Sequence, residues 1–335
     1  MSENILTVKD LKTYFYTASG VAKAVDGVSF NIAKGETMGI VGESGSGKSV
    51  TSSSIIRLLP PRTGKIVGGS IEFEGKDVLA LSKKELNDFR GKDIAVVFQD
   101  PMTSLDPVFK IGKQMTEMIM AHQNVTKDEA WKMAVEALNK VGIPEPEKRM
   151  NSYPYELSGG MCQRVIIAMA VCCKPIIADE PTTALDVTVQ AQVLELLKDL
   201  QRNMDTAILL ITHNLGVVWE MCDKVMVMYA GNTVEFTDTK TLYSNPRHPY
   251  TWGLLDSMPK LSDESKGELK TIPGTTPDLR LTGKCCNFYN RCPYVTEACT
   301  QSVPPLVEVE PGHFVACHRQ NLTNKLEKGE GLKDE

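Results

Sequence analysis

Glycine and serine residues surround one lysine in the sequence GIVGESGSGKSV at 39–50. Gly42, Gly47, Lys48 and Ser49 fit the pattern G-x-x-x-x-G-K-[ST]. Glycines allow successive backbone N–H groups to point at a phosphate, the lysine can reach the β- and γ-phosphates, and the serine hydroxyl can hold Mg²⁺. The pattern therefore predicts binding of a nucleoside triphosphate. The loop residues expected at the nucleotide are Gly42, Ser44, Gly45, Gly47, Lys48, Ser49 and Val50.

Two elements must flank this loop if it is to hold phosphate. The apolar run at 36–42 ends at a glycine and predicts a buried strand. The sequence SVTSSSIIRLL after Lys48 predicts a helix that includes Leu59 and stops before Pro60. Such a helix would add its positive N-terminal end to the site. A flexible turn without a ligand is the alternative, and the order strand, loop, helix favours the nucleotide site.

A second candidate site lies at the end of the apolar residues of PIIADEP, at 175–181. Asp179 is placed to bind Mg²⁺, and Glu180 could orient or deprotonate an attacking water. An acidic strand end that faces solvent is the alternative, because Asp-Glu pairs are common on surfaces. The runs IAVVFQ at 94–99 and TAILLITH at 206–213 also end in polar residues. Together these runs predict buried strands of an α/β sheet whose site lies at the strand ends.

Two segments between these strands predict helices, at 112–123 and 126–142. In the second segment, Thr126 and Glu129 have the spacing of a capping box, and Gly142 can end the helix. The two helices suggest a helical insertion in the α/β domain. The apolar residues expected on the buried face of the second helix are Trp131, Val135, Leu138 and Val141.

Composition excludes several classes of protein. The 335 residues carry a net charge of −5 without a long basic block, which argues against a nucleic-acid partner. The longest apolar run, at 165–173, is far shorter than the roughly 18 residues that a membrane span requires. The start of the chain lacks the basic and then apolar order of a secretory signal. We therefore expect a cytosolic location, in which cysteines stay reduced.

Five of the nine cysteines fall between 285 and 317, in a part of the chain where prolines recur from about 241 onward. Four soft thiolates suit zinc or an iron–sulfur cluster, although the spacing C-x5-C-x6-C-x17-C matches neither common ferredoxin pattern. Free buried thiols are the alternative. Cys285 could replace Cys286, and His313 and His318 keep a zinc site open. The candidate ligands are Cys286, Cys292, Cys299 and Cys317.

Three further motifs occur in a fixed order: LSGGMCQR at 157–164, TALD at 183–186 and ITHN at 211–214. With the glycine loop and the Asp-Glu pair, they make the chain resemble the ATPase subunits of ABC transporters along nearly its whole length. The resemblance implies an α/β fold, a P-loop NTPase of the ABC ATPase type. It implies an ATPase domain at 1–240 with a helical subdomain at about 100–165. A C-terminal module at 241–335 would carry the cysteine cluster.

The same resemblance implies a role for single residues. Gln99 would sense Mg²⁺ and the transport subunit, and His213 would contact the γ-phosphate. Asp186 would lie at the interface of two ATPase subunits. Phe15 would stack on adenine, with Tyr14 and Tyr16 as rivals for that position. The segment expected to bind the γ-phosphate of ATP held by the opposite subunit comprises Ser158, Gly159 and Gly160.

The segments at 244–261 and 98–107 resemble the oligopeptide, dipeptide and nickel importers among ABC transporters, and the D-type ATPases of peptide permeases in particular. The resemblance implies ATP hydrolysis that powers peptide import, at the cytoplasmic face of the membrane. It implies a related F-type ATPase as heterodimer partner, two membrane-embedded permease subunits and an external peptide-binding protein. It also implies a [4Fe–4S] cluster on the cysteines. An importer of nickel or another small solute is the alternative, and a soluble ABC ATPase outside transport is a further one.

The sequence departs from its relatives in two places. Cys162 stands where relatives usually carry a polar or basic residue, which would weaken contacts at that helix start. The stretch CCKPIIADEP is two residues shorter than in relatives, so that Pro175 falls where a strand hydrogen bond is needed. We therefore expect a short strand before Asp179 and a less stable domain than in relatives.

Overall fold

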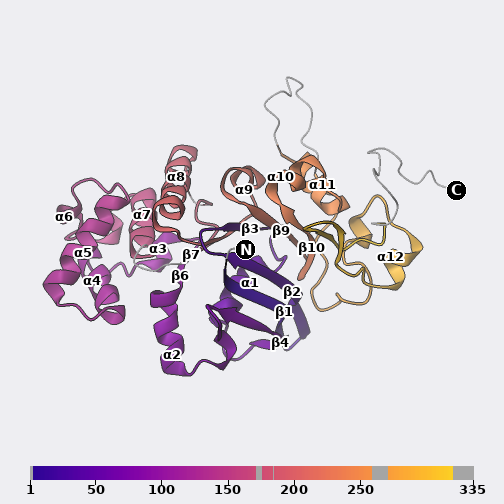
Figure 1. Ribbon diagram of the computed structural model, residues 1–335, viewed down its shortest axis with the longest axis horizontal. Coiled ribbons are helices and arrows are strands. Elements are labelled where there is room, and N and C mark those ends of the chain that lie inside the picture. Colours follow the sequence, from indigo (N-terminus) through magenta and orange to yellow (C-terminus); the bar gives the residue numbers. More distant parts are fainter. Residues whose placement is uncertain (1–2, 171–175, 184, 259–270, 320–335) are drawn as a thin grey trace, which may run out of the picture. The chain divides into compact units, whose positions relative to one another are not determined.

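The computed structural model describes residues 3–170, 176–183, 185–258 and 271–319 (Figure 1). By its internal contacts the chain divides into two compact units, each built from several segments. The first unit comprises Met1–Ile5, Ile32–Thr37 and Asp77–Ile211. The second unit comprises Leu6–Asn31, Met38–Lys76 and Thr212–Glu335.

Three parallel strands form the sheet of the first unit, in the order β6, β7, β8. Each of them is an apolar run that sequence reasoning identified, and the structure confirms all three as strands. In the register, Val97 lies opposite Ala178 and Asp179 lies opposite Ile211. The described part of the strand that leads to the acidic pair is Ile176–Asp179, and the residues at 171–175, including Pro175, lie outside the described residues, so the predicted shortening of this strand stays a prediction. The strands are β6 (Ala95–Val97), β7 (Ile176–Asp179) and β8 (Ile208–Thr212), and the helix between the last two is α8 (Val187–Met204).

A group of helices makes up the rest of the first unit (Figure 1). Its largest members, α4, α5 and α7, pack against one another. The helices predicted at 112–123 and 126–142 are α4 and α5. The helices are α2 (Lys83–Asp88), α3 (Pro101–Ser104), α4 (Ile111–His122), α5 (Lys127–Lys140), α6 (Pro146–Arg149) and α7 (Gly159–Ala170), with short turns η1 (Val78–Ala80), η2 (Phe89–Asp93) and η3 (Pro154–Glu156).

Helix α5 starts as predicted, and its buried face matches the predicted one in part. Thr126 N donates to Glu129 Oε2 at 2.8 Å, and Glu129 N donates to Thr126 Oγ1 at 3.4 Å, which is a complete capping box. Of the four residues expected in the core, Leu138 and Val141 are buried, whereas Trp131 and Val135 are only half-buried. Small side chains face the neighbouring helices instead, because they let two helix axes approach closely. The buried residues are Ala130, Ala134, Ala137 and Leu138.

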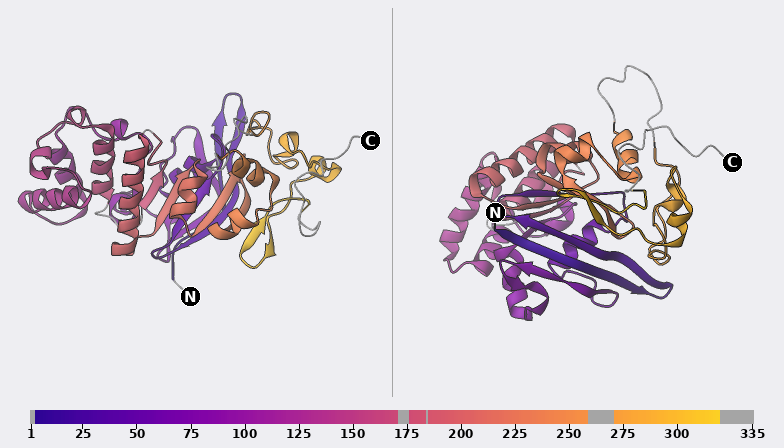
Figure 2. Two further views of the ribbon diagram at one scale, coloured as in Figure 1. Left: turned by 90° about the horizontal axis from the view of Figure 1, so that it is seen from above. Right: turned by 45° about the vertical axis from the view of Figure 1, so that its right-hand side comes forward.

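Two sheets occur in the second unit, and Figure 2 shows the long strands of the first of them in indigo. In that sheet β1 lies between β2 and β4. In the other, β3 pairs in parallel with β9, and β9, β10, β12 and β11 follow one another as antiparallel neighbours. The strands are β1 (Asn4–Thr17), β2 (Gly20–Ala33), β3 (Thr37–Val41), β4 (Gly64–Phe73), β5 (Lys76–Asp77), β9 (Lys224–Tyr229), β10 (Asn232–Asp238), β11 (Val307–Glu310) and β12 (His313–Val315).

The helices of the second unit are short. They are α1 (Lys48–Ile55), α9 (Leu215–Met221), α10 (Thr239–Ser244), α11 (Pro249–Asp256) and α12 (Glu297–Gln301), with the turn η4 (Tyr289–Arg291). The first follows the glycine loop as predicted and ends at Ile55 rather than Leu59. Arg57 adopts a left-handed conformation with φ 54°, and Leu58 N donates to Ser53 O, which closes the helix before the prolines. In the described part of the chain, no helix is both long and apolar enough to span a membrane.

Candidate nucleotide-binding site

The glycine loop of the second unit has a backbone that only glycine fits at two positions. Gly42 and Gly47 have φ values of 152° and 106°. A Cβ atom on Gly42 would overlap the carbonyl oxygen of Met228, and one on Gly47 would overlap that of Ala24. Gly45 also has a positive φ of 78° but faces open space. The loop therefore packs tightly at its two ends and is open in its middle.

Lys48 lies at the point where the loop becomes a helix. Gly47 caps α1, and the Lys48 side chain turns back over the loop and donates to Gly42 O at 2.8 Å and to Glu43 O at 3.0 Å. Backbone N–H groups and a lysine ammonium at a helix N-terminus are the groups that bind phosphate. Ser44, Gly45 and Ser49 are exposed, and Val50 is half-buried. The loop thus has the parts that the sequence pattern predicts for a nucleotide site.

Phe15 lies on the same face of β1 as Thr13, whose hydroxyl contacts Ser54 of α1 at 2.8 Å. Alternation along a strand places Tyr14 and Tyr16 on the other face. The Tyr14 hydroxyl donates to Asp26 at 2.7 Å, and burial together with this carboxylate raises the pKa of Tyr14 to about 12. Of the three aromatic residues, Phe15 is the one on the side of the helix that follows the loop. Its contact with adenine stays a prediction.

In the first unit, Glu180 directly follows β7 and adopts a left-handed backbone with φ 49°. Its carboxylate accepts a hydrogen bond from Gln99 Nε2 at 3.0 Å and another from Thr183 Oγ1 at 2.9 Å. Its N–H donates to Ile211 O at 2.8 Å. Asp179, one residue earlier, is buried. The structure therefore brings together Gln99 and Glu180, which sequence reasoning had named separately, and adds Thr183.

The Ser-Gly-Gly segment forms the start of α7 in the first unit. Ser158 Oγ accepts from Met161 N at 3.3 Å, and Ser158 and Gly159 are exposed. A Cβ atom on Gly160 would lie 2.5 Å from Val189 Cγ1 on α8, whereas one on Gly159 would meet nothing within 4 Å. Gly159 is thus free to face a ligand, and Gly160 is required by helix packing.

Cys162, at the position where relatives usually carry a polar or basic residue, is fully buried. Its thiol donates to Pro154 O at 3.4 Å, and burial raises the pKa of the thiol. Cysteine behaves here as a small core residue. The expected weakening of contacts at this helix start stays a prediction.

Two further predicted residues lie at helix starts. Asp186 caps α8, since its carboxylate accepts from Val189 N at 2.9 Å. His213 belongs to the second unit, is exposed, and stands between β8 and Asn214, the residue that caps α9. The roles predicted for both residues stay predictions.

The four predicted cysteine ligands gather in the second unit. The pKa of Cys286 is raised to about 12, first by burial and further by the thiols of Cys299, Cys317 and Cys292. Burial also raises the pKa of Cys292 to about 11, again with Cys317 and Cys299 nearby. In addition, Cys286 N donates to Cys299 O at 3.0 Å. Each of the four thiols is therefore within electrostatic reach of the other three, whereas Cys285 does not contribute to these shifts.

The donor chemistry of this cluster fits a soft metal centre, but its arrangement is not closed around an ion. No group of three or more His, Cys, Asp or Glu side chains in the described ranges is placed to hold a metal ion. His313 Nε2 is engaged with Glu235 Oε1 at 2.8 Å, and His318 Nε2 lies 2.9 Å from Ser302 O. The two histidines that kept a zinc site open therefore have other partners.

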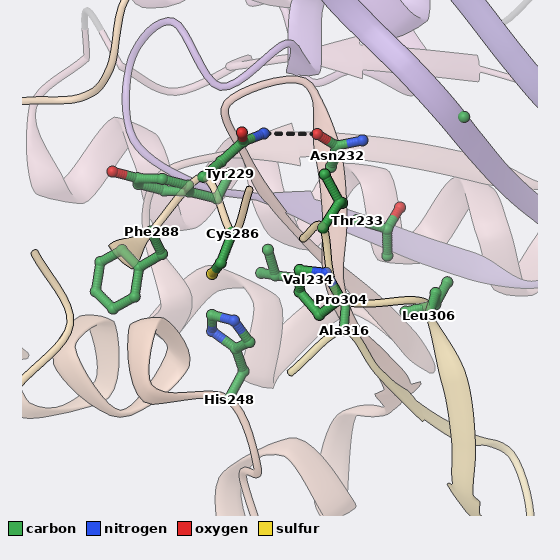
Figure 3. Close-up of a pocket in the computed structure, with 13 residues that line it drawn as sticks. Tyr229, Asn232, Thr233, Val234, His248, Cys286, Phe288, Pro304, Leu306 and Ala316 are labelled. Carbon is green, nitrogen blue, oxygen red and sulfur yellow. Dashed lines mark hydrogen bonds between the residues drawn. The ribbon is translucent and has the colours of Figure 1, made fainter. Parts of the chain in front are cut away.

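A cavity of about 150 Å³ borders the cysteine segment (Figure 3). His248 Nδ1 accepts from Tyr250 N at 3.1 Å, and Asn287 Nδ2 donates to Asn232 Oδ1 at 2.8 Å. These polar groups of the wall are thus paired, and the Cys286 thiol links the cavity to the cysteine cluster. Aromatic residues on this wall are Tyr229 and Phe288.

Sequence reasoning missed Glu43 in the glycine loop and the two residues that bind it, Arg291 and Tyr250. Glu43, inside the loop, pairs with Arg291, and its N–H donates to the Tyr250 hydroxyl at 2.8 Å. A signal was present in the sequence, because an acidic residue in a phosphate-binding loop needs a positive partner. Which of the many basic residues would supply that partner could not be read from the sequence.

Known proteins share both halves of this chain. A family model described as "ABC transporter" matches residues 25–183, and one described as "Oligopeptide/dipeptide transporter, C-terminal region" matches residues 234–299. The oligopeptide transport ATP-binding protein OppD of Bacillus subtilis (strain 168) is 53% identical over 93% of this chain and 87% of its own length. The dipeptide transport ATP-binding protein DppD of the same organism is 48% identical over 95% of this chain and 96% of its own length.

A comparison with solved structures also finds ATP-binding cassettes. The ATP-binding cassette MJ0796, in a dimeric post-hydrolysis state bound to ADP and Pi, has a TM-score of 0.63 and 26% identity, over 70% of this chain and 98% of that one. Along the chain, the nucleotide loop comes first, the Ser-Gly-Gly helix start second and the acidic strand end third. This is the order that the family resemblance implied. The chain therefore belongs to the ATPase family of ABC transporters, in the branch of oligopeptide/dipeptide transporter ATP-binding proteins.

Proposed function

We propose that this protein is the ATP-binding and ATP-hydrolysing subunit of an importer of dipeptides or oligopeptides. The observation that carries the proposal is the identity of about half of all residues with peptide-transport ATP-binding proteins over more than nine-tenths of the chain. The match includes the C-terminal region at 234–299 as well as the ATPase motifs. The alternative function is the same role in an importer of nickel or another small solute.

Hydrolysis in this proposal depends on residues with separate roles. The loop N–H groups and Lys48 bind the β- and γ-phosphates, and Phe15 stacks on adenine. Ser49, Asp179 and Gln99 are the proposed Mg²⁺ ligands, and the bound ion supplies positive charge to the phosphates. Glu180, oriented by Gln99 and Thr183, accepts a proton from the attacking water. His213 contacts the γ-phosphate.

A second ATPase subunit completes the site in this proposal. Ser158, Gly159 and Gly160 bind the γ-phosphate of the nucleotide held by the partner, and Asp186 lies at the same interface. The exposed backbone of Gly159 at the start of a helix supports this role, because helix N-termini bind anions. Two ATPases closed around nucleotide and open without it would couple hydrolysis to motion. The proposed partner is a related but distinct ATPase, so that the pair is a heterodimer.

The assembly extends to the membrane. We infer two permease subunits that span the bilayer, this chain bound to their cytoplasmic face, and an external peptide-binding protein that delivers cargo. The residues at 1–240 form the ATPase domain and those at 241–335 form the C-terminal module. In that module, Cys286, Cys292, Cys299 and Cys317 are the proposed ligands of a [4Fe–4S] cluster, with zinc as the alternative. The soft donor chemistry of these four thiols, which are buried or half-buried, supports this assignment.

Reconstitution of the whole transporter in liposomes tests the proposed function. The vesicles contain ATP, and uptake of a labelled tripeptide is measured after addition of the binding protein. We expect uptake that needs ATP and is lost with Lys48→Ala in this chain. Uptake of Ni²⁺ without any peptide uptake would replace the peptide assignment, and undiminished uptake with Lys48→Ala would contradict the ATPase role.

A further inference from the structure

The glycine loop is held from the C-terminal segment of the chain by one arginine. Arg291 Nη1 donates to Glu43 Oε2 at 2.6 Å, and Arg291 Nη2 donates to Glu43 Oε1 at 2.9 Å. This is a two-pronged pair between a planar guanidinium and a carboxylate, which fixes direction as well as charge. The Arg291 side chain is 5% exposed and that of Glu43 is 29% exposed, so solvent screens the pair only partly.

The guanidinium is itself held in place on its other sides. Its Nε donates to Pro273 O at 2.9 Å, and its Nη2 also donates to Ile272 O at 3.2 Å. Its Nη1 lies 3.3 Å from the hydroxyl of Tyr229. Such a saturated guanidinium cannot swing away with the loop. It therefore provides a fixed point against which the loop residue is placed.

Glu43 connects this fixed point to the lysine of the loop. Its N–H donates to the Tyr250 hydroxyl at 2.8 Å. Its carbonyl accepts from Lys48 Nζ at 3.0 Å and from Ser46 N at 3.2 Å. Side chain, N–H and carbonyl of one loop residue are thus all engaged. A change at Arg291 would be felt at the backbone that presents Lys48 to phosphate.

Charge gives a second reason for the pair. A carboxylate next to a triphosphate repels it, and the repulsion is strong where solvent is partly excluded. Arg291 neutralises the Glu43 carboxylate and holds both of its oxygens. Without that partner, Glu43 would lower the affinity of the loop for any anionic nucleotide.

The same arginine is joined to the cysteine cluster by the chain itself. Arg291 ends the turn η4, its N–H donates to Phe288 O at 3.0 Å, and the next residue is Cys292. Phe288 packs edge-on against Tyr229 and Tyr250, with ring centroids 5.2 Å and 5.4 Å apart. Tyr229 and Phe288, which both contact Arg291, therefore also belong to the wall of the cavity that Cys286 lines (Figure 3).

We propose that Arg291 is a positioning residue for nucleotide binding, which acts through Glu43 and makes the phosphate-binding loop depend on the folded C-terminal cysteine segment. This inference rests on the nucleotide-binding role proposed above for the loop. Arg291 does not touch the nucleotide in this account. Arg291 fixes the position of Glu43 and neutralises its negative charge.

A double-mutant cycle on the full-length protein tests the proposal. The affinity for ATP that carries a fluorescent ribose group is measured for the wild type, Arg291→Met, Glu43→Gln and the double variant. We expect Arg291→Met to weaken binding about tenfold in the wild type and less than about threefold in the Glu43→Gln background, because the two residues act as one unit. An equal loss in both backgrounds, or no loss in either, would overturn the proposal.

Further variants separate this role from a general loss of structure. Arg291→Lys keeps the charge without the fork, and we expect it to raise the KM for ATP and leave kcat unchanged. Should Arg291→Met not fold, an unaltered KM in Arg291→Lys overturns the proposal by itself. Arg280→Met is the matched control, since Arg280 pairs with Asp278 in the same segment and is exposed. Lys48→Ala is included because wild-type affinity in that variant would mean that the loop assignment itself is wrong.

Discussion

Gln99 Nε2 donates a hydrogen bond to Glu180 Oε2 at 3.0 Å, which joins the residue two positions after β6 to the residue that follows β7. The two strands are parallel neighbours, so their carboxyl ends lie at one edge of the sheet. An amide that donates to a carboxylate fixes the orientation of that carboxylate. This is the arrangement that a residue positioning an attacking water requires.

Glu180→Gln should stop hydrolysis and leave nucleotide binding intact. The amide keeps the shape of the side chain but cannot accept the proton of the attacking water. We expect the rate of phosphate release in the assembled complex to fall about 100-fold or more, with ATP retained. The matched control is Glu195→Gln, since Glu195 on α8 is exposed and its nearest ion-pair partner, Lys198, is 4.0 Å away. Unchanged phosphate release in Glu180→Gln would mean that another residue is the base.

Gly45, in the middle of the loop, should tolerate substitution by alanine better than Gly47, at its end. Gly47→Ala places a methyl group on the carbonyl of Ala24 in a left-handed backbone, so we expect a loss of about 2 kcal/mol or more of stability and of measurable nucleotide binding. Gly45→Ala meets open space and should cost about 1 kcal/mol for its backbone conformation alone. Thermal denaturation and nucleotide titration measure both effects. Equal losses in the two variants would contradict the described geometry of the loop.

Adjacent glycines at the start of α7 should separate a ligand contact from a packing contact. Gly159→Asp adds an acidic side chain to the first turn of a helix, which favours the helix, so the melting temperature should not fall. The same charge would repel the γ-phosphate held by a partner subunit, and ATPase activity of the complex should be lost. Gly160→Ala instead presses on Val189 and should cost about 1–3 kcal/mol of stability. An active complex that contains Gly159→Asp would contradict the role proposed for this segment.

Local patterns in the sequence were sufficient for much of this architecture. The loop with its flanking strand and helix, the acidic strand end and the capping box each depend on residues within a few positions of one another. The buried face of α5 was predicted only in part. Leu138 and Val141 are buried as expected, but α5 packs against both α4 and α7, and small residues such as Ala134 face inward in place of Trp131. The early end of α1 depends on the left-handed conformation of Arg57, which side-chain type does not favour.

Contacts between residues far apart in the chain could not be predicted from the sequence. Arg291 and Glu43 are separated by 248 residues, and nothing in the spacing of either residue indicates the other. The same holds for Tyr250, whose hydroxyl contacts the loop from α11. The cysteines are the exception, because their chemistry alone suggested that distant members would gather. Their type restricts the partners that they can have, whereas an arginine can pair with any carboxylate.

Acid should destabilise the second unit through His248. Burial lowers the pKa of His248 to about 4 against the opposing effect of Glu235, so the folded protein holds this ring neutral while the unfolded chain binds a proton below about 6.5. Between those two values the unfolded state binds more protons, and stability falls as pH falls. The loss is at most about 3 kcal/mol, and it is complete below about pH 4, where both states are protonated.

Comparison with a variant isolates this effect from the titration of other groups. His248→Gln cannot take up the proton. We expect the difference in free energy of unfolding between wild type and His248→Gln, measured in urea, to change between pH 7 and pH 4.5 in favour of the variant. A difference that is constant over this range would mean that His248 is not held neutral.

Substitution of single cysteines should decide between a metal–sulfur centre and free thiols. If Cys286, Cys292, Cys299 and Cys317 hold a [4Fe–4S] cluster, protein purified without oxygen should absorb broadly near about 400 nm and contain about four iron atoms per chain. Cys292→Ser should lose the absorption and the iron, because a serine hydroxyl is a poor ligand for iron that thiolates bind. Cys285→Ser is the matched control and should retain both, since Cys285 adjoins Cys286 but takes no part in the mutual effects of the four thiols. One zinc ion per chain without the absorption would replace iron by zinc, and neither metal would leave the four cysteines as free thiols.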